Sequence, residues 1–257
     1  MPVVECGEIV FNQPLTKGYL HLRAYAPEVA RDIQPGQFVQ VKVRPGMQPL
    51  LRTPLSIHDA SAEHGWLDLL YRILGESTQL LSEMKSGDSL DLLGPLGHGF
   101  SLPEAGYEAW LLAGGIGVAP LYYLATQLLL QGYTTRLLYG VRTASELVRA
   151  EDFQKLGVQV YTSSDDGSTG FRGTVVQLAE SIDLPKHVKL YACGPRPMLR
   201  AVDELAVRRG LPAELSLEEY MACGIGACLG CACAMREGGY AHVCTDGPVF
   251  RGGEVRL

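Results

Sequence analysis

The feature that most constrains this chain is a cluster of cysteines in its last forty residues. Four of the seven cysteines fall in "MACGIGACLGCAC", residues 221–233. The spacing Cys223-x4-Cys228-x2-Cys231 with a later Cys244 is the plant-type spacing of four thiolates around a 2Fe-2S cluster. Such a loop must turn tightly so that its thiols point inward, and the intervening glycines give the backbone that freedom. We therefore expect these four cysteines to be the cluster ligands.

Two other interpretations of the cysteines remain open. The thiols could be inert, and we take Cys233 as a packing residue because its one-residue offset from Cys231 fits the ligand spacing poorly. The odd number of cysteines argues against a simple disulfide framework. A structural zinc site is the second alternative. Its ligands would be Cys228, Cys231 and Cys244 with either His242 or Cys223.

Composition narrows the class of protein. Of the 257 residues, 47% are hydrophobic and 19% are charged, which is typical of a globular chain with a real core. The net charge is −6 and no basic stripe with interleaved aromatic residues occurs, so we expect no nucleic-acid partner. The first ten residues lack the pattern of a signal peptide, and no apolar run reaches the length of a membrane span. We expect a cytoplasmic protein with no membrane partner.

Three segments differ in pattern, and together they predict an α+β multidomain fold. Residues 1–100 hold short runs rich in Val, Leu, Ile and Tyr, which predict an antiparallel β-barrel or sandwich. One helix is expected over residues 77–85, with Ser77 or Thr78 as its cap. Residues 101–215 alternate strand and helix, which predicts a doubly wound parallel α/β sheet. Residues 216–257 carry the cysteines and little regular structure, so we expect a metal centre to organise them.

Two glycine-containing turns follow buried strands of the second segment. Backbone amides at such a strand-to-helix turn bind phosphate, and ligands of open α/β sheets lie at the carboxyl ends of the strands. Two turns at two strand ends predict one nucleotide that crosses both. A tight connection is the plain alternative for the first turn, and a buried thiol is the plain alternative for the second. The candidate residues are Gly114, Gly115, Gly117 and Pro120 in the first turn and Cys193 and Gly194 in the second.

The first segment also carries polar residues that suit a phosphate or a flavin. Arg52, Thr53 and Ser56 in "LLRTPLSI" can contact a phosphate or the edge of a flavin ring. Ser77 and Thr78 stand at a predicted helix start, where a pyrophosphate would be stabilised. An ordinary strand arginine and an ordinary helix cap are the plain alternatives.

The order of these motifs resembles that of the ferredoxin-NADP reductase superfamily. An R-x-x-S-like segment, then G-x-S-T, GGxGxxP and CGPxxM, matches a flavin-binding barrel followed by a nicotinamide-binding domain. With "SLEEYMACGIGACLGCAC" and "VCTDGPVF", essentially the whole chain is similar to electron-transfer subunits of two-subunit, NAD-linked dihydroorotate dehydrogenases. The resemblance implies cluster ligands at the four cysteines, and FAD contacts at Thr53, Pro54, Leu55, Ser56, Leu70, Tyr71, Arg72, Ser77 and Thr78.

The chain departs from the family pattern at one position. Many relatives have arginine directly before the proline of the first motif, whereas this chain has Thr53 there and Arg52 one place earlier. Successive residues of a strand point to opposite faces, so the shift moves the cation to the other side. Arg52 then reaches round to the flavin phosphate, or that phosphate lacks one charge.

The resemblance also implies a function. Electrons would come from the FMN of a partner as it oxidises dihydroorotate, and would pass through a 2Fe-2S cluster and FAD to NAD+, in pyrimidine biosynthesis. A (β/α)8 barrel takes ~250 residues, so the dehydrogenase itself must be another polypeptide, bound near the cluster. We expect a heterotetramer of two plus two subunits. No acid–base residue is expected, because the flavin carries the hydride.

Three alternatives share parts of this interpretation. Two are enzymes: the small subunit of an NADH-dependent ferredoxin:NADP oxidoreductase and the diaphorase subunit of a hydrogenase. The third is a zinc-stabilised module that senses NAD(H) without flavin or catalysis. The choice between NAD and NADP depends on side chains after the strand "TRLLYGV", where Arg142 and Thr143 stand, and only the resemblance favours NAD.

Overall fold

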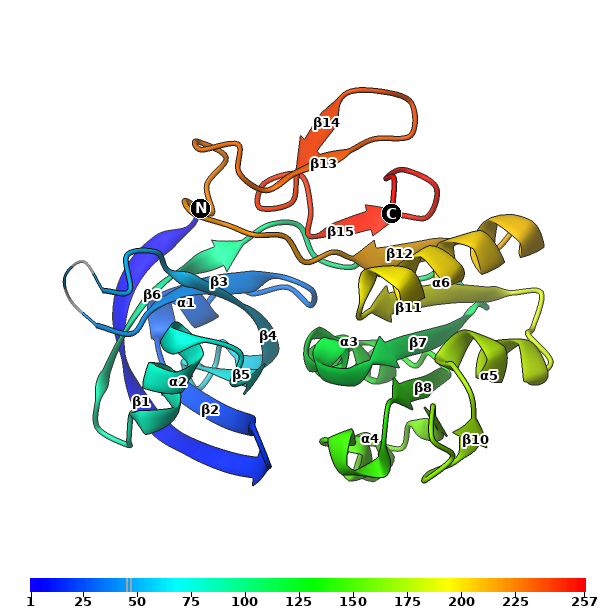
Figure 1. The fold of residues 1–257 in the computed structure, drawn as a ribbon, viewed down its shortest axis with the longest axis horizontal. Coiled ribbons are helices and arrows are strands. Elements are labelled where there is room, and N and C mark those ends of the chain that lie inside the picture. Colours follow the sequence, from blue (N-terminus) through cyan, green and yellow to red (C-terminus); the bar gives the residue numbers. More distant parts are fainter. Residues whose placement is uncertain (45, 47) are drawn as a thin grey trace.

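The first part of the chain forms a closed antiparallel barrel. In the computed structural model, which describes residues 1–44, 46 and 48–257, the barrel strands follow the order β1-β2-β5-β4-β3-β6 (Figure 1). This confirms the predicted barrel. The elements are β1 (Val3–Thr16), β2 (Tyr19–Tyr25), α1 (Pro27–Ala30), β3 (Phe38–Lys42), β4 (Thr53–Ser61), β5 (Trp66–Arg72), α2 (Glu76–Glu83) and β6 (Ser89–Leu96).

The predicted cap of the barrel helix is wrong. Helix α2 begins at Glu76, and Gly75 is its N-cap residue, so Ser77 and Thr78 lie inside the first turn. Thr78 still serves the helix start, because its Oγ1 accepts hydrogen bonds from the backbone amides of Leu74 at 2.9 Å and Gly75 at 3.1 Å. The hydroxyl reaches backward from the third helical position and ties down the residues that precede the helix.

The second part of the chain is the predicted doubly wound sheet. Its order is β10-β9-β8-β7-β11-β12-β15, and all neighbours are parallel except β12 and β15. The strands are β7 (Glu108–Gly114), β8 (Thr135–Val141), β9 (Gln159–Ser164), β10 (Phe171–Arg172), β11 (Val188–Cys193), β12 (Ala213–Ser216) and β15 (Val249–Arg251). The helices are η1 (Gly115–Val118), α3 (Ala119–Leu130), η2 (Ala144–Glu146), α4 (Ala150–Lys155), α5 (Val175–Ser181) and α6 (Arg196–Arg209).

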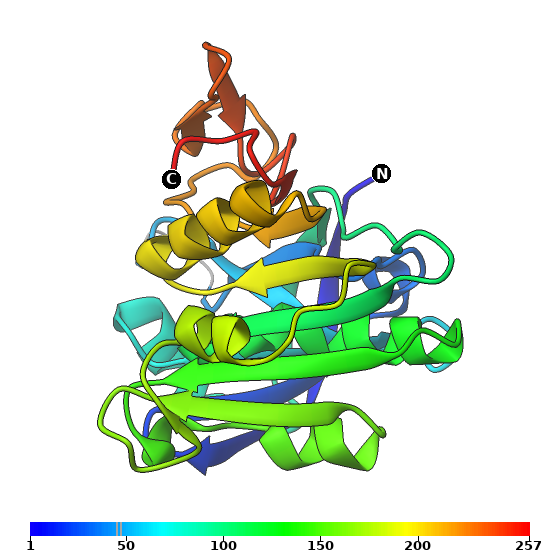
Figure 2. The same ribbon diagram turned by 90° about the vertical axis from the view of Figure 1, so that its right-hand side faces the viewer.

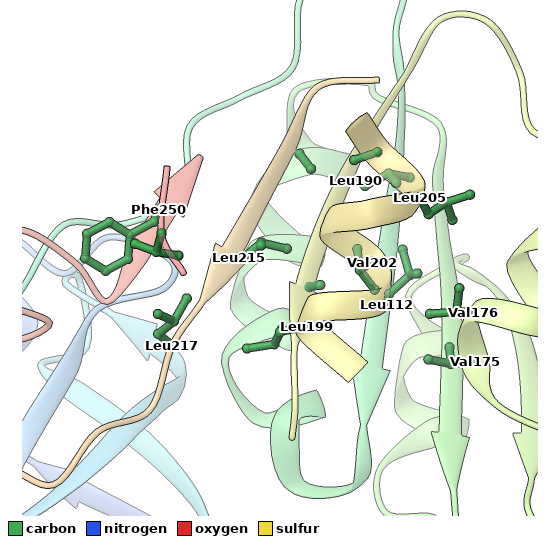
Figure 3. Packing of buried hydrophobic residues seen from close by; sticks show 14 of the residues in the cluster. Leu112, Val175, Val176, Leu190, Leu199, Val202, Leu205, Leu215, Leu217 and Phe250 are labelled. Carbon is green, nitrogen blue, oxygen red and sulfur yellow. The ribbon is translucent and has the colours of Figure 1, made fainter. Parts of the chain in front are cut away.

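Alternating side chains of the central strands divide the core between the two faces of this sheet. Leu111 of β7 packs with α3 and α4, whereas Leu112 of the same strand packs with α5 and α6. Figure 2 shows helices on both faces of the sheet. On the second face Leu199, Val202 and Leu205 of α6 lie over the sheet (Figure 3). No helix in the described ranges is long and apolar enough to cross a membrane.

The cysteine-bearing segment is more regular than its sequence predicts. It contains the hairpin of β13 (Ala232–Ala234) and β14 (Tyr240–His242), and β15 extends the main sheet by pairing with β12. The expected boundary at residue 215 therefore falls inside β12. Figure 1 shows this segment lying across the barrel and the sheet together. Backbone amides join it to both parts: His98 of the barrel side donates to Gly247 at 2.6 Å, and Gly252 donates to Ala213 at 2.8 Å.

Phe250 of β15 is the apolar anchor of the segment. Its side chain is 4% exposed and belongs to the core cluster that contains Leu215 and Leu217. The ring also packs against Gly247, because a methyl carbon added to that glycine would lie 2.4 Å from the ring. We expect Phe250→Ala to lower the free energy of unfolding by about 3 to 5 kcal/mol, since it removes a buried ring and leaves a cavity. Urea unfolding followed by tryptophan fluorescence measures this. Phe250→Leu serves as the volume-conserving comparison, and equal losses for both would contradict the cavity argument.

Candidate cofactor sites between barrel, sheet and cysteine loop

A cavity of about 830 Å³ lies where the three parts of the chain meet. The barrel contributes β4, β5 and the start of α2, the sheet contributes the start of α3, and residues 217–221 cross over it. Every FAD contact implied by the resemblance lines this cavity. These residues are Thr53, Pro54, Leu55, Ser56, Leu70, Tyr71, Arg72, Ser77 and Thr78.

The lining suits a flavin dinucleotide. The N-terminus of α2 faces the cavity with Gly75, Glu76 and Ser77, and the first amides of a helix have no partner within it, which favours a bound phosphate there. Arg72 supplies a cation on the same wall. Apolar atoms of β4 on one side and of the crossing residues on the other leave room for a flat ring.

Arg52 does not line this cavity. Its Nη2 donates to both carboxylate oxygens of Asp91, each at 2.8 Å, and its Nη1 donates to the backbone oxygen of Asp91 at 3.2 Å. It lies instead in a second cavity of about 450 Å³ beside Lys42 and Cys223. Arg52 lies one residue before β4, and its guanidinium is held by Asp91 away from the large cavity, so the geometry gives no support to Arg52 as a flavin contact.

The two glycine turns lie side by side, as their strand ends predict. Strand β7 pairs with β11, and Ala113 is opposite Cys193. A methyl carbon at Gly117 would lie 2.2 Å from the backbone oxygen of Cys193, and one at Gly114 would lie 2.6 Å from the sulfur of Met198. Gly114 and Gly117 are therefore needed for the close packing of the two turns, since a larger side chain at either position would clash.

The other residues of the two turns have different surroundings. Gly115 has φ +54° and open space at its Cα, and Pro120 lines the cavity. Gly194 has φ +158° and lies against Gly114, where a methyl carbon would be 3.0 Å from the Gly114 backbone. Cys193 is 1% exposed, and burial raises the pKa of its thiol. The sulfur of Cys193 is thus buried, which agrees with the alternative that it is a packing thiol. A nucleotide bound here would contact the backbone of the turn and not this sulfur.

The cysteine loop places four thiols in two pairs. The amide of Cys228 donates to the sulfur of Cys223 at 3.3 Å, and the amide of Cys244 donates to that of Cys231 at 3.4 Å. Gly224 and Gly226 have φ of +71° and +80°, the left-handed conformation that such a turn requires. Amides that point at sulfur stabilise thiolates and tune a bound cluster.

The pKa values of the thiols follow the same arrangement. Partial burial opposes ionisation of Cys223, but hydrogen bonds from the backbone at Ile225, Ala227 and Cys228 outweigh it and lower the pKa to about 7. Burial and the neighbouring Cys231 raise the pKa of Cys244 to about 11. The backbone around Cys223 thus already favours the thiolate form. Cys244, in contrast, needs a bound cation such as iron to stabilise its thiolate.

Two pairs of thiols fit a centre with two irons, each of which takes two thiolates. Among the residues that the structure describes, no group of three or more His, Cys, Asp or Glu side chains is arranged around a single metal ion. The zinc alternative needs four ligands that converge on one point. Cys233 on β13 is 3% exposed and belongs to the core cluster that contains Val243 and Phe250, as do the predicted ligands Cys231 and Cys244.

Sequence reasoning missed two parts of this region. Residues 217–221 lie over the large cavity, and Glu218 among them lines it, with a carboxyl pKa raised by burial. Gln40 of β3 is fully buried beneath the cysteine loop. The position of "SLEEYM" between the last sheet strand and the cysteines could have indicated the first. Nothing in the sequence distinguishes Gln40 from other strand glutamines.

Comparison with known proteins agrees with this architecture. Three family models match the chain: an oxidoreductase FAD-binding domain over residues 12–100, an oxidoreductase NAD-binding domain over 111–204, and the iron-sulfur cluster binding domain of dihydroorotate dehydrogenase B over 218–256. The dihydroorotate dehydrogenase B (NAD(+)) electron transfer subunit of Geobacillus thermodenitrificans is 47% identical over 89% of each chain. The subunit of the same name from Bacillus cereus strain B4264 is 41% identical over 97% of each.

Solved structures show the same fold. An NADH-dependent reduced ferredoxin-NADP oxidoreductase superposes with a TM-score of 0.88 at 29% identity, covering 97% of this chain and 89% of the other. A ferredoxin NADP+ reductase from Neisseria gonorrhoeae, solved with FAD and NADP, gives 0.70 at 19% identity, over 80% of this chain and 92% of its own, a likeness of fold alone.

The fold and these matches define an oxidoreductase subunit with FAD-binding, NAD-binding and iron–sulfur-binding domains. More narrowly, the chain belongs to the family of dihydroorotate dehydrogenase B electron transfer subunits. The resemblance drawn from the motifs is thereby confirmed. The individual contacts to each cofactor remain predictions that the geometry supports to different degrees.

The ligand set can be tested with two matched cysteine variants. We expect Cys231→Ser to reduce iron and acid-labile sulfide to less than half of the wild-type content, because one buried thiolate is lost. Cys233→Ser changes the same atom two residues away and should keep the wild-type content, since Cys233 packs in the core. Iron and sulfide assays on anaerobically purified protein measure both. Equal loss in the two variants would show that the ligand set is misassigned.

Proposed function

We propose that this chain carries electrons from a catalytic, FMN-containing dihydroorotate dehydrogenase subunit to NAD+, through a 2Fe-2S cluster and FAD, in de novo UMP synthesis. One observation carries the proposal. Residues 217–221 line the large cavity, and the chain continues directly to Cys223, the first cysteine of the loop. The proposed flavin site and the proposed cluster site are therefore adjacent. The names of the relatives supply the substrate and the direction.

The chain's own residues would hold and enclose the cofactors. Bound flavin supplies the exchange of hydride with nicotinamide and of single electrons with the cluster. Thr53–Ser56 of β4 and Leu70–Arg72 of β5 would bind the flavin, and the start of α2 its phosphates. Leu217 and Met221 cover the cavity and limit the access of water. The four cysteines would hold the cluster as thiolates.

We propose that NAD lies across the carboxyl ends of β7 and β11, with its adenosine half toward β8. Ligands of doubly wound sheets lie at such strand ends, and the strand order reverses between these two. Gly115 offers open backbone there. Arg142, at the end of β8, is paired with Glu146, so its charge is already balanced. This pairing supports NAD over NADP, whose 2′-phosphate needs a free cation.

The partner would dock on the exposed side of the cysteine loop. Ile225 and Leu229 are 54% and 60% exposed within that loop, and Leu50 and Leu51 share the second cavity with Cys223. Exposed apolar groups gathered in this way mark interaction surfaces. We propose a heterotetramer of two such chains and two catalytic subunits, located in the cytoplasm, where reduced cysteines are the rule.

The first experiment is co-purification from the native source, with the cofactors assayed in each subunit. We expect FAD and two irons on this chain and FMN on the partner, with dihydroorotate-dependent reduction of NAD+ by the complex. The isolated chain should oxidise NADH with artificial acceptors and show no turnover of dihydroorotate. A partner without FMN would instead favour the ferredoxin:NADP oxidoreductase interpretation, for which the 0.88 superposition is the supporting observation. A colourless chain with one zinc would exclude both.

Nucleotide selectivity gives a second test. We expect Glu146→Gln to lower the KM for NADPH by about tenfold, because it frees Arg142 to bind a 2′-phosphate. Steady-state NADPH and NADH oxidation with an artificial acceptor measures the ratio of kcat/KM for the two nucleotides. The double variant Glu146→Gln with Arg142→Ala is the control and should lose the gain. An unchanged kcat/KM ratio in the single variant would show that Arg142 does not contact the bound nucleotide.

A further inference from the structure

A fully buried glutamine lies under the cysteine loop with its amide unused. Gln40 is 0% exposed, and neither its Nε2 nor its Oε1 has a hydrogen-bond partner among the described residues. Buried polar side chains are nearly always hydrogen-bonded, so an unused amide in this position needs an explanation. In the barrel Gln40 is opposite Pro54 of β4 and Leu93 of β6, and its backbone oxygen accepts a hydrogen bond from Arg52 Nη1 at 3.4 Å.

The Gln40 side chain points at the residue that follows the first cysteine. A methyl carbon built on Gly224 would lie 2.7 Å from Gln40 Nε2 and 2.9 Å from its Cδ. Side chains of β3 alternate, so Val39 and Val41 fill the barrel core while Phe38 packs outward with the C-terminal segment. Gln40 shares the outward face, and no side chain at Gly224 separates its amide from the loop.

Gln40 also lies close to the proposed flavin site. Its strand partner Pro54 and its neighbour Phe38 both line the large cavity, whereas Gly224 belongs to the loop that starts at Cys223. The amide thus stands on the strand between the two proposed redox centres. It is a neutral donor shielded from water, where a hydrogen bond to an anion is stronger than in bulk solvent.

We propose that the Gln40 amide donates through Nε2 to the sulfur of the bound cluster or of its Cys223 ligand, as a positioning residue that raises the reduction potential of the cluster. The proposal rests on the proposed function of the cysteine loop. A reduced cluster carries one more negative charge than an oxidised one, so a donor that points at its sulfur stabilises the reduced state more. The same contact holds the loop against the barrel and gives the buried amide its partner.

The test compares the potential of the cluster in the full-length chain purified anaerobically with its FAD. In Gln40→Met, of similar size but without a donor, we expect the equilibrium constant for one-electron reduction to fall about tenfold, which is about 59 mV for a one-electron couple. Redox titration followed by the electron paramagnetic resonance of the reduced cluster measures this.

The matched control is Gln37→Met, the same substitution three residues earlier. The Gln37 amide donates to the backbone oxygen of Gly97 at 2.7 Å, so its loss should affect stability and leave the potential unchanged. Reduced cluster content in Gln40→Met does not obscure the result, because the potential is read on the occupied fraction. An unchanged potential and spectrum in Gln40→Met would overturn this inference alone, whereas wild-type protein without iron would overturn the proposed function.

Discussion

The antiparallel pairing of β15 with β12 is the constraint on which the cofactor region depends. Ser216 pairs with Val249 and Glu214 with Arg251, so the chain leaves the sheet and returns to it at adjacent strands. Adjacent strands lie about 4.8 Å apart, which fixes both ends of residues 217–248. The excursion between them lies across the barrel and the sheet together (Figure 1). Residues 217–221 cover the cavity in consequence, and Cys244 is brought back to Cys231.

A polar contact fixes the barrel against the sheet on the other side of the cavity. His58 of β4 is fully buried, and its Nδ1 donates to the backbone oxygen of Ala119 at the start of α3, 2.8 Å away. Burial lowers the pKa of His58 to about 3, so the ring is neutral at pH 7 and this bond persists. The strand that carries Thr53–Ser56 is thereby held to the helix that carries Pro120, and the two walls of the cavity keep their spacing.

The sequence predicts the three-part architecture because each part rests on a local signal. Strand alternation, strand–helix alternation and cysteine spacing are readable within windows of about 15 residues. Contacts between distant segments leave no such signal. The turn formed by Gly114 and Gly117 is visible as glycine, but its packing against Cys193 emerges only with the sheet order. Arg52 illustrates the same limit, because its pairing with Asp91 of β6 becomes visible only in the folded barrel.

The arrangement also explains why one chain can serve both two-electron and one-electron chemistry. Hydride transfer needs nicotinamide and flavin in contact, so both walls of that site must be rigid, and the proposed sites draw their walls from the barrel and the carboxyl ends of the strands. Transfer of single electrons needs only proximity, so the cysteines can occupy an irregular loop. The barrel links the two requirements through β3 and β4: Pro54 faces the large cavity, and its strand partner Gln40 meets the loop at Gly224. A displacement of the loop is thus opposed by the same sheet that shapes the proposed flavin site.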